Sequence, residues 1–159
     1  MKKLFVVTGK VKSGKTTRLS EWCERQESVS GILQPVIDGK RFIKSISTGE
    51  IRKLEISEND LSDKIIRVGN YCFDKNIIEW AKITLLADKS LNSEWLIVDE
   101  FGKLEMDEKG LEPVITFLIN DKDLREQTKL IIVVRNFLWQ DFLSRYSLKD
   151  EDYEIFSFD

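Results

Sequence analysis

LFVVTGKVKSGKTT, residues 4–17, joins a short apolar run to a turn that contains three lysines. The run Leu4–Val7 predicts a strand buried on both faces, and the composition becomes helical from Lys15 to about Gln26. Between these elements, Gly9 to Thr16 fits the pattern G-x-x-x-x-G-K-[ST]. Lysines this close together repel one another unless an anion lies among them, so the stretch predicts a phosphate-binding loop.

The glycines of such a loop let backbone N–H groups turn inward around a phosphate, and the next helix points its positive end at the same place. Lys15 is expected to reach the β- and γ-phosphates and to assist catalysis, and the Thr16 hydroxyl to bind Mg²⁺. The alternative is a lysine-rich surface turn without a ligand. The residues expected to bind the phosphates are Gly9, Lys10, Val11, Lys12, Ser13, Gly14, Lys15, Thr16 and Thr17.

A second buried strand is predicted over EWLIVDEFG, residues 94–102, and it closes with two acids. A phosphate-binding loop of this kind requires an acid at the end of another strand to hold the Mg²⁺ shell, and Asp99 is in the right place. Glu100 would orient and polarise the attacking water. The alternative for Glu100 is a solvated strand-end acid or a helix cap.

Composition limits the other functions. A length of 159 residues predicts one domain over residues 1–159, and the net charge of −3 argues against a nucleic-acid partner. A monomer is favoured, although the sequence leaves the oligomeric state open. The absence of histidine excludes Ser-His-Asp and Cys-His catalysis and His-ligated zinc. The two cysteines form no CxxC pair, and no apolar stretch approaches membrane-spanning length. We therefore expect a cytoplasmic protein without a membrane partner.

The remaining elements indicate an α/β fold with a mainly parallel central sheet, helices on both faces, and an attached antiparallel β-meander. Residues 31–56 alternate apolar and polar around Asp38-Gly39, which predicts the meander. The other expected strands are 64–74, 129–134 and 153–158. One further helix is expected directly after Asp74, and two more over about 111–119 and 139–145. Residues 121–129 are expected to form a solvated loop.

Three segments carry a resemblance to a known family. VDEFGKLEM, residues 98–106, resembles the VDEIGKMEL signature of the small P-loop nucleoside-triphosphatases first described from thermophiles, whose human member is the cancer-related nucleoside-triphosphatase. RVGNY, residues 67–71, resembles that family's RVGxY segment, and residues 31–46 resemble its strand pair. The resemblance extends over nearly the whole chain.

The resemblance implies Mg²⁺-dependent hydrolysis of nucleoside triphosphates (ATP, GTP and others) to diphosphate and phosphate, with broad tolerance for the base. It assigns the metal to Asp99 and the water to Glu100, and it places Lys103 near the transferred charge. It also transfers phosphate binding to Arg67, which could equally be a structural ion-pair donor. Arg135 and Asn136 follow the strand 129–134, where the family often carries a small polar residue suited to sensing the γ-phosphate.

Two rival functions remain open at this point. A kinase would move the γ-phosphate to a nucleoside or another small acceptor, and a non-catalytic switch would bind nucleotide without turning it over. The loop is unusual, because Val11 and Lys12 replace the family's Pro and Gly. The chain also ends at Asp159, where relatives often continue with a polar segment beside the base.

Overall fold

The computed structural model describes residues 3–9, 14–57 and 64–158. The loop residues Lys10, Val11, Lys12 and Ser13 lie outside this part, so their predicted phosphate contacts are not described. The strands are β1 Leu4–Gly9, β2 Val29–Leu33, β3 Val36–Ile37, β4 Lys40–Ser45, β5 Ile51–Lys53, β6 Glu55–Ile56, β7 Ile65–Val68, β8 Tyr71–Asp74, β9 Trp95–Phe101, β10 Lys129–Arg135 and β11 Tyr153–Ile155. The α-helices are α1 Lys15–Glu24, α2 Lys75–Asp88, α3 Lys103–Met106, α4 Val114–Asn120, α5 Lys122–Gln127 and α6 Trp139–Arg145.

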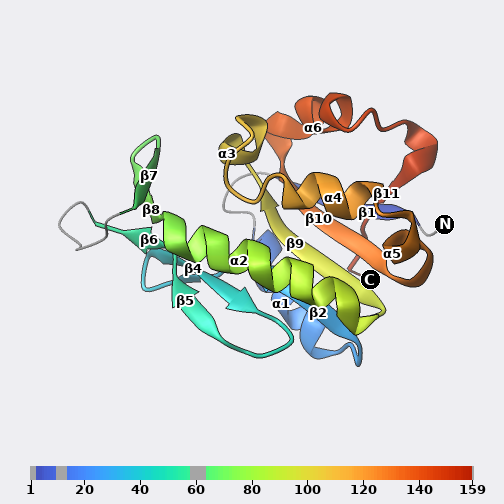
Figure 1. Cartoon of the computed structure of the whole chain (residues 1–159), viewed down its shortest axis with the longest axis horizontal. Coiled ribbons are helices and arrows are strands. Elements are labelled where there is room, and N and C mark those ends of the chain that lie inside the picture. Colours follow the sequence, from blue (N-terminus) through green and yellow to red (C-terminus); the bar gives the residue numbers. More distant parts are fainter. Residues whose placement is uncertain (1–2, 10–13, 58–63, 159) are drawn as a thin grey trace.

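The central sheet has a parallel half and an antiparallel half. Its parallel strands lie in the order β11-β1-β10-β9-β2, and β4 continues the sheet antiparallel to β2, with β3 and β5 both pairing with β4. Strands β6, β8 and β7 form a second, antiparallel sheet. The predicted α/β class with a mostly parallel core is confirmed, and Figure 1 shows the antiparallel strands extending from one end of the molecule.

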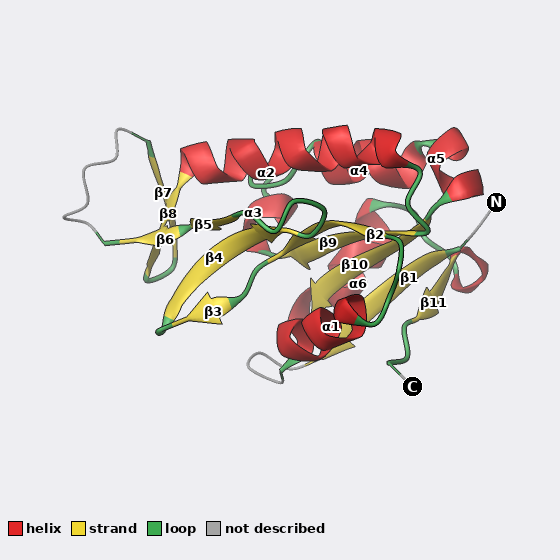
Figure 2. Cartoon of the chain, turned by 90° about the horizontal axis from the view of Figure 1, so that it is seen from below, coloured by secondary structure: helices red, strands yellow, loops and turns green. Residues whose placement is uncertain are grey.

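The two faces of the sheet are covered unequally. Figure 2 shows α1 on one face and α2, α4 and α5 on the other. Because side chains alternate along a strand, β1 contributes to both cores. Leu4 and Val6 belong to the large core cluster, on the face covered by α2 and α4. Val7 belongs to the smaller core cluster, which also contains residues of α1. The α1 face is completed by rings of Trp22, Trp95 and Phe156 that meet edge to face. These aromatic rings therefore pack in the core of the α1 face.

Four sequence-based boundaries were wrong. Residues 64–74 are a hairpin of β7 and β8, because Gly69 has a φ of 58° and turns the chain. Residues 122–127 form helix α5 rather than a solvated loop, because Asp121 caps Leu124 N–H at 3.0 Å and Leu124 is buried. Helix α4 begins after Pro113, which occupies its N-cap, and the last strand ends at Ile155.

The segment predicted as a meander is divided between the two halves of the fold. Its first strand, β2, pairs in parallel with β9 and so belongs to the parallel half. Its last strand, β6, pairs with β8 in the second sheet. Helix α2 begins after Asp74 as expected, and Asp74 caps it, since Asn76 N–H donates to its carboxylate at 2.9 Å. No described helix is long and apolar enough to cross a membrane.

Candidate functional site

The predicted site residues collect at the carboxyl ends of the parallel strands, where α/β sheets commonly bind ligands. A cleft of about 560 Å³ opens there between α1, the end of β9 and the antiparallel strands. Of the loop residues predicted to bind phosphate, Gly14, Lys15, Thr16 and Thr17 line this cleft, and Gly9 ends strand β1. From the antiparallel half and its surroundings, the cleft receives Gln34, Pro35, Val36, Gly39, Arg41, Glu55 and Tyr71.

The loop enters α1 through a glycine. Gly14 caps the helix with a φ of 79°, a backbone conformation that side chains with a Cβ rarely adopt. The ammonium of Lys15 donates to the carbonyl oxygen of Gly9 at 3.0 Å, across the mouth of the loop. Lys15 and the start of α1 line the same cleft, and the free N–H groups of a helix N-terminus commonly bind phosphate.

Asp99 lies where β9 meets α1. It is 1% exposed, and its Oδ2 accepts hydrogen bonds from the Thr16 hydroxyl and from Gln34 N–H, both at 2.9 Å. Its other oxygen, Oδ1, is buried and has no hydrogen-bond partner among the described residues. Burial, and next the negative charge of Glu100, raise the pKa of Asp99.

Glu100 stands out of the regular pairing of the sheet. Val133 of β10 pairs with Asp99 and Val134 pairs with Phe101, so Glu100 is the extra residue of a bulge. The bulge shifts the alternation of β9 by one, so that Phe101 packs in the same core cluster as Leu96 and Val98. The two neighbouring acids therefore have different surroundings.

Two arginines hold the Glu100 carboxylate. Arg135 Nε donates to Glu100 Oε1 at 2.8 Å, and Arg41 Nη1 approaches the same oxygen at 3.4 Å. All three side chains line the cleft. Of the two residues left open at the end of β10, Arg135 thus reaches the site, whereas Asn136 lines neither the cleft nor the cavity beside it.

Arg41, Gln34 and Tyr71 were missed by the sequence analysis. All three lie between α1 and α2, in the segments 31–46 and 67–71 that resemble the family, but the resemblance assigned only Arg67 of these segments to the site. Arg41 follows the Asp38-Gly39 turn, which predicted the β3–β4 hairpin that carries it but gave no indication of where that hairpin would lie. Only the packing of β4 beside β2 brings Arg41 to the end of β9.

Two other predicted residues lie apart from the cleft. Lys103 lines the neighbouring cavity instead, with its ammonium 5.9 Å from the centroid of the Phe137 ring. Arg67 is an exposed residue of β7 and lines neither the cleft nor that cavity. The structure therefore brings Lys15, Thr16, Asp99 and Glu100 together but not these two cations.

Glu105 of the VDEFGKLEM segment is buried. Its carboxylate accepts hydrogen bonds from Gly102 N–H and Leu111 N–H, both at 2.8 Å, and thereby joins the start of α3 to the chain before α4. A Cβ on Gly110 would lie 1.8 Å from Glu105 Oε2, so only glycine fits there. Burial raises the pKa of Glu105 to about 7 against the opposing effect of the two backbone donors. This acid therefore holds α3 against the segment before α4.

Known proteins resemble this chain in sequence and in fold. A family model described as NTPase matches residues 4–159. The chain belongs to this NTPase family. The crystal structure of THEP1 from the hyperthermophile Aquifex aeolicus is similar over 99% of this chain and 90% of that one, with a TM-score of 0.71 and 17% sequence identity. A search of curated proteins finds no match.

Membership of the NTPase family makes nucleotides the substrates to consider and supports an NTP-hydrolysing enzyme in general. The likeness to THEP1 shows that the two chains share a fold. The resemblance to the small P-loop nucleoside-triphosphatases drawn from the sequence is thereby confirmed. The metal, the range of substrates and the role of each side chain follow from neither comparison.

Proposed function

We propose that this NTPase hydrolyses nucleoside 5′-triphosphates to the diphosphate and phosphate in a Mg²⁺-dependent reaction. The observation that carries the proposal is the placement of two acids at the end of β9, one against the hydroxyl of Thr16 and one in the cleft between two arginines. Phosphate binding is assigned to the loop and α1, and hydrolysis to Glu100.

The residues present fit a magnesium ion. Mg²⁺ prefers oxygen ligands and is commonly held by one or two carboxylates together with substrate phosphates. Thr16 and Asp99 offer such oxygens in contact with each other, and Asp99 Oδ1 is buried without a partner among the described residues. A buried carboxylate is costly without a compensating charge, which a divalent cation supplies. When bound, the ion would neutralise charge that develops on the phosphate oxygens.

Glu100 is assigned the task of the general base. Its carboxylate accepts the proton of the attacking water, the water oxygen bonds to the γ-phosphorus, and the bond from that phosphorus to the β,γ-bridging oxygen breaks. The products are a nucleoside diphosphate and inorganic phosphate. Lys15 lies beside the cleft from the loop side and is assigned to the β- and γ-phosphates.

Arg41 and Arg135 are assigned to the charge on the γ-phosphate. Without nucleotide, the single negative charge of Glu100 is shared by both guanidinium groups and offsets only part of their positive charge. The γ-phosphate oxygens of an entering nucleotide compete with Glu100 for the same donors, because arginine binds phosphate as readily as carboxylate. Transfer of the arginines to phosphate would leave the Glu100 carboxylate able to accept a proton and would place two positive charges at the transition state.

The test is a phosphate-release assay with ATP, GTP, CTP and UTP, with and without Mg²⁺, on the wild type and on Lys15→Ala. We expect Mg²⁺-dependent release from all four nucleotides in water, without any added acceptor. We expect Lys15→Ala to weaken nucleotide binding about tenfold to a hundredfold, as for the loss of one charged hydrogen bond. Consumption of the nucleotide that requires an added acceptor and leaves no free phosphate would indicate a kinase. Nucleotide binding without turnover would indicate a switch, and either result contradicts the proposal.

A further inference from the structure

We propose that a second cavity, beside the nucleotide cleft, is a binding chamber for a small amphipathic ligand with a ring-sized apolar body and one anionic group. The cavity has a volume of about 260 Å³, slightly below the roughly 300–1,000 Å³ of pockets for drug-sized molecules. It lies on the far side of Glu100 from the phosphate-binding loop, since α1 lines the cleft but not this cavity.

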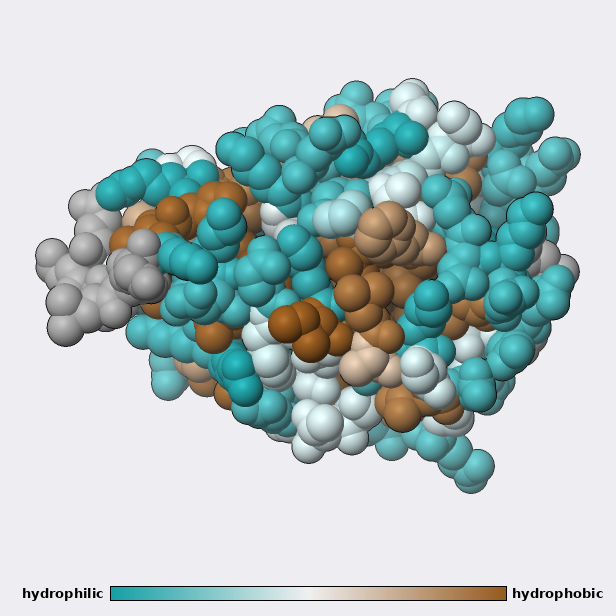
Figure 3. Space-filling model, viewed as in Figure 1, coloured by the Kyte–Doolittle hydropathy of each residue, from teal (hydrophilic) through white to brown (hydrophobic). Residues whose placement is uncertain are grey.

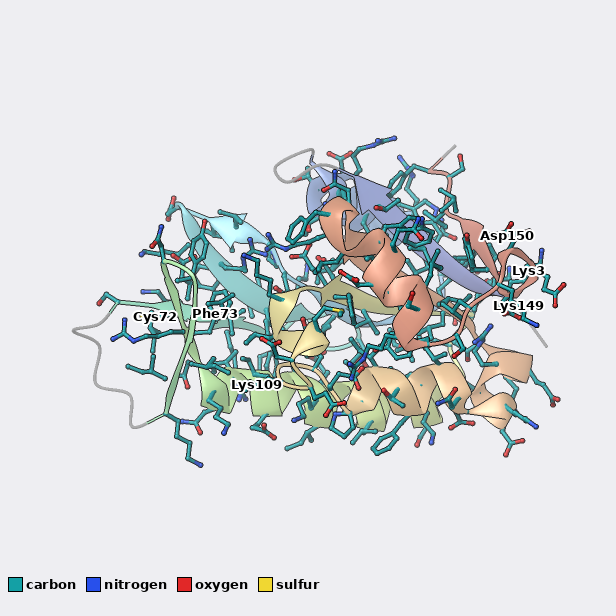
Figure 4. All side chains as sticks on the ribbon, turned by 90° about the horizontal axis from the view of Figure 1, so that it is seen from above. Lys3, Cys72, Phe73, Lys109, Lys149 and Asp150 are labelled. Atoms are coloured by element: carbon teal, nitrogen blue, oxygen red, sulfur yellow. The ribbon has the colours of Figure 1, made fainter. Side chains whose placement is uncertain are left out.

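The chamber walls are mostly apolar and come from both sheets and the elements between them. The apolar side chains that line it are Ile43, Leu54, Val68, Phe73, Ile78, Leu104, Leu111 and Phe137. Figure 4 shows Phe73 on the side of β8 nearer α3, with Cys72 on the other side of the strand. Tyr71 and Phe73 stack at 6.2 Å between ring centroids, so the β8 wall offers an aromatic surface to a flat ligand.

The charged rim of the chamber selects an anion. Glu100 already neutralises part of the charge of Arg41 and Arg135, and Glu105 is engaged by two backbone donors. Lys103 is exposed, lines the chamber, and forms no ion pair with any acid among the described residues. A carboxylate or phosphate at the mouth would be paired by Lys103 while the apolar body of the ligand is buried inside.

The chamber shares a wall with the nucleotide cleft. Gln34, Tyr71 and the group of Arg41, Glu100 and Arg135 line both cavities. A ligand in the chamber therefore contacts the side chains assigned to the γ-phosphate, and coupling between the two sites is reciprocal. This coupling rests on the proposed function, whereas binding in the chamber does not.

The probe for the experiment is 2-naphthoate, and its neutral counterpart is 2-naphthamide. Calorimetry on the full chain should give one 2-naphthoate site per chain. Val68→Trp fills the chamber from a half-buried position and should weaken binding more than tenfold. Ile65→Trp, on the same strand but outside the chamber, is the matched control and should bind as the wild type does.

Lys103→Gln separates the anionic contact from the apolar one. This variant should weaken 2-naphthoate about threefold to fivefold, as for an exposed ion pair, and leave 2-naphthamide unchanged. Equal effects on the acid and the amide would overturn the assignment of the anionic group. Equal binding by Val68→Trp and the wild type would overturn the chamber.

A competing surface lies on the opposite side of α2. Figure 3 shows apolar side chains gathered over α2 and α4, where Ile83, Leu86 and Phe117 are exposed. Phe117→Ser should leave 2-naphthoate binding unchanged, and loss of binding in this variant would place the probe on that surface and overturn the proposal. If Val68→Trp does not fold, NMR of the wild type tests the chamber instead. The amide signals of Gly69 and Gly110, which line the chamber, should shift when 2-naphthoate is added, and the amide signal of Gly49 should not.

Lys15→Ala distinguishes this proposal from the proposed function. Lys15 lines only the nucleotide cleft, so its variant should bind 2-naphthoate with wild-type affinity while nucleotide binding is weakened. A chain without NTP hydrolysis that still binds 2-naphthoate in the chamber would contradict the proposed function alone. A hydrolytic chain that binds no 2-naphthoate would contradict the chamber alone.

Discussion

The two halves of the central sheet contribute different parts of the candidate site. The parallel half supplies Thr16 and Asp99, which touch at 2.9 Å, and the loop lysine. The antiparallel half supplies Arg41 and the backbone N–H of Gln34, which precedes it in the chain. The halves meet at Asp99 and Glu100, where each acid is contacted from both sides.

This difference bears on how firmly the two sets of side chains are held in place. The groups of the parallel half are fixed by strands that are buried on both faces, so their positions depend little on surface loops. Arg41 lies on a strand that pairs with β2 through only two residue pairs. The position of its guanidinium therefore depends on the packing of the antiparallel strands, which also form the chamber.

The largest effect is expected within the parallel half, at Glu100. Glu100→Gln keeps the size of the side chain but cannot accept a proton, and general-base catalysis contributes roughly 10² to 10⁴ in rate. Single-turnover phosphate release at saturating Mg–ATP should fall by that factor. The nucleotide should bind at least as tightly as to the wild type, because the carboxylate that competes for Arg41 and Arg135 is gone. Glu94→Gln, at the exposed start of the same strand, is the control and should be silent. A loss below about threefold would remove Glu100 from catalysis.

The contrast between the two halves of the sheet also explains which parts of the site the sequence could predict. The phosphate-binding loop and the acids of β9 are local patterns: an apolar run, a glycine turn, a lysine, and two carboxylates at a strand end. Arg41 meets Glu100 across 59 positions of the chain, and no local pattern encodes that contact. The bulge that displaces Glu100 and the burial of Glu105 likewise depend on neighbouring strands and on Gly110.

The second prediction concerns Glu105, whose hydrogen bonds join Gly102, directly after β9, to Leu111 in the chamber wall. Its pKa of about 7 in the folded protein is above the 4.5 of an unperturbed glutamate, so the folded state holds this proton more tightly. The resulting stabilisation is fully present below pH 4.5 and is lost as the pH rises through 7. Between pH 5 and 8, the free energy of unfolding of the wild type should fall by about 2–3 kcal/mol relative to Glu105→Gln, since one pKa unit corresponds to about 1.4 kcal/mol.

Urea denaturation of both proteins at the two pH values measures this difference. Glu154→Gln, on the exposed edge strand β11, provides the matched control and should follow the wild type. Parallel pH profiles for the wild type and Glu105→Gln would show that this carboxyl keeps its ordinary pKa. In that case, the backbone donors would balance the effect of burial.

The third prediction tests the antiparallel half directly. Arg41→Gln should lower the single-turnover rate about tenfold to a hundredfold, because it removes one charged hydrogen bond to the γ-phosphate in the transition state. Arg135→Gln should have an effect of the same size from the parallel half. Arg52→Gln, on the neighbouring strand β5, should not change the rate, since its guanidinium contacts Glu50 and the Trp80 ring instead. A wild-type rate for Arg41→Gln would restrict the chemistry to the parallel half.

The smallest effect is expected for the metal, although its ligand is the most deeply buried acid of the site. Asp99→Asn keeps one oxygen that can accept from Thr16 and Gln34, so the fold should survive, but the negative charge that attracts the ion is lost. Removing one charged partner should raise the Mg²⁺ concentration for half-maximal activity about tenfold. Titration of Mg²⁺ in the phosphate-release assay gives this value, and chelation of the metal should abolish release in both proteins.

Asp88→Asn is the control. Asp88 is also buried, but it accepts hydrogen bonds from Gly31 N–H and the Ser47 hydroxyl and does not line the cleft. An unchanged Mg²⁺ requirement in Asp99→Asn would mean that this acid orders β2 and α1 and does not attract the ion.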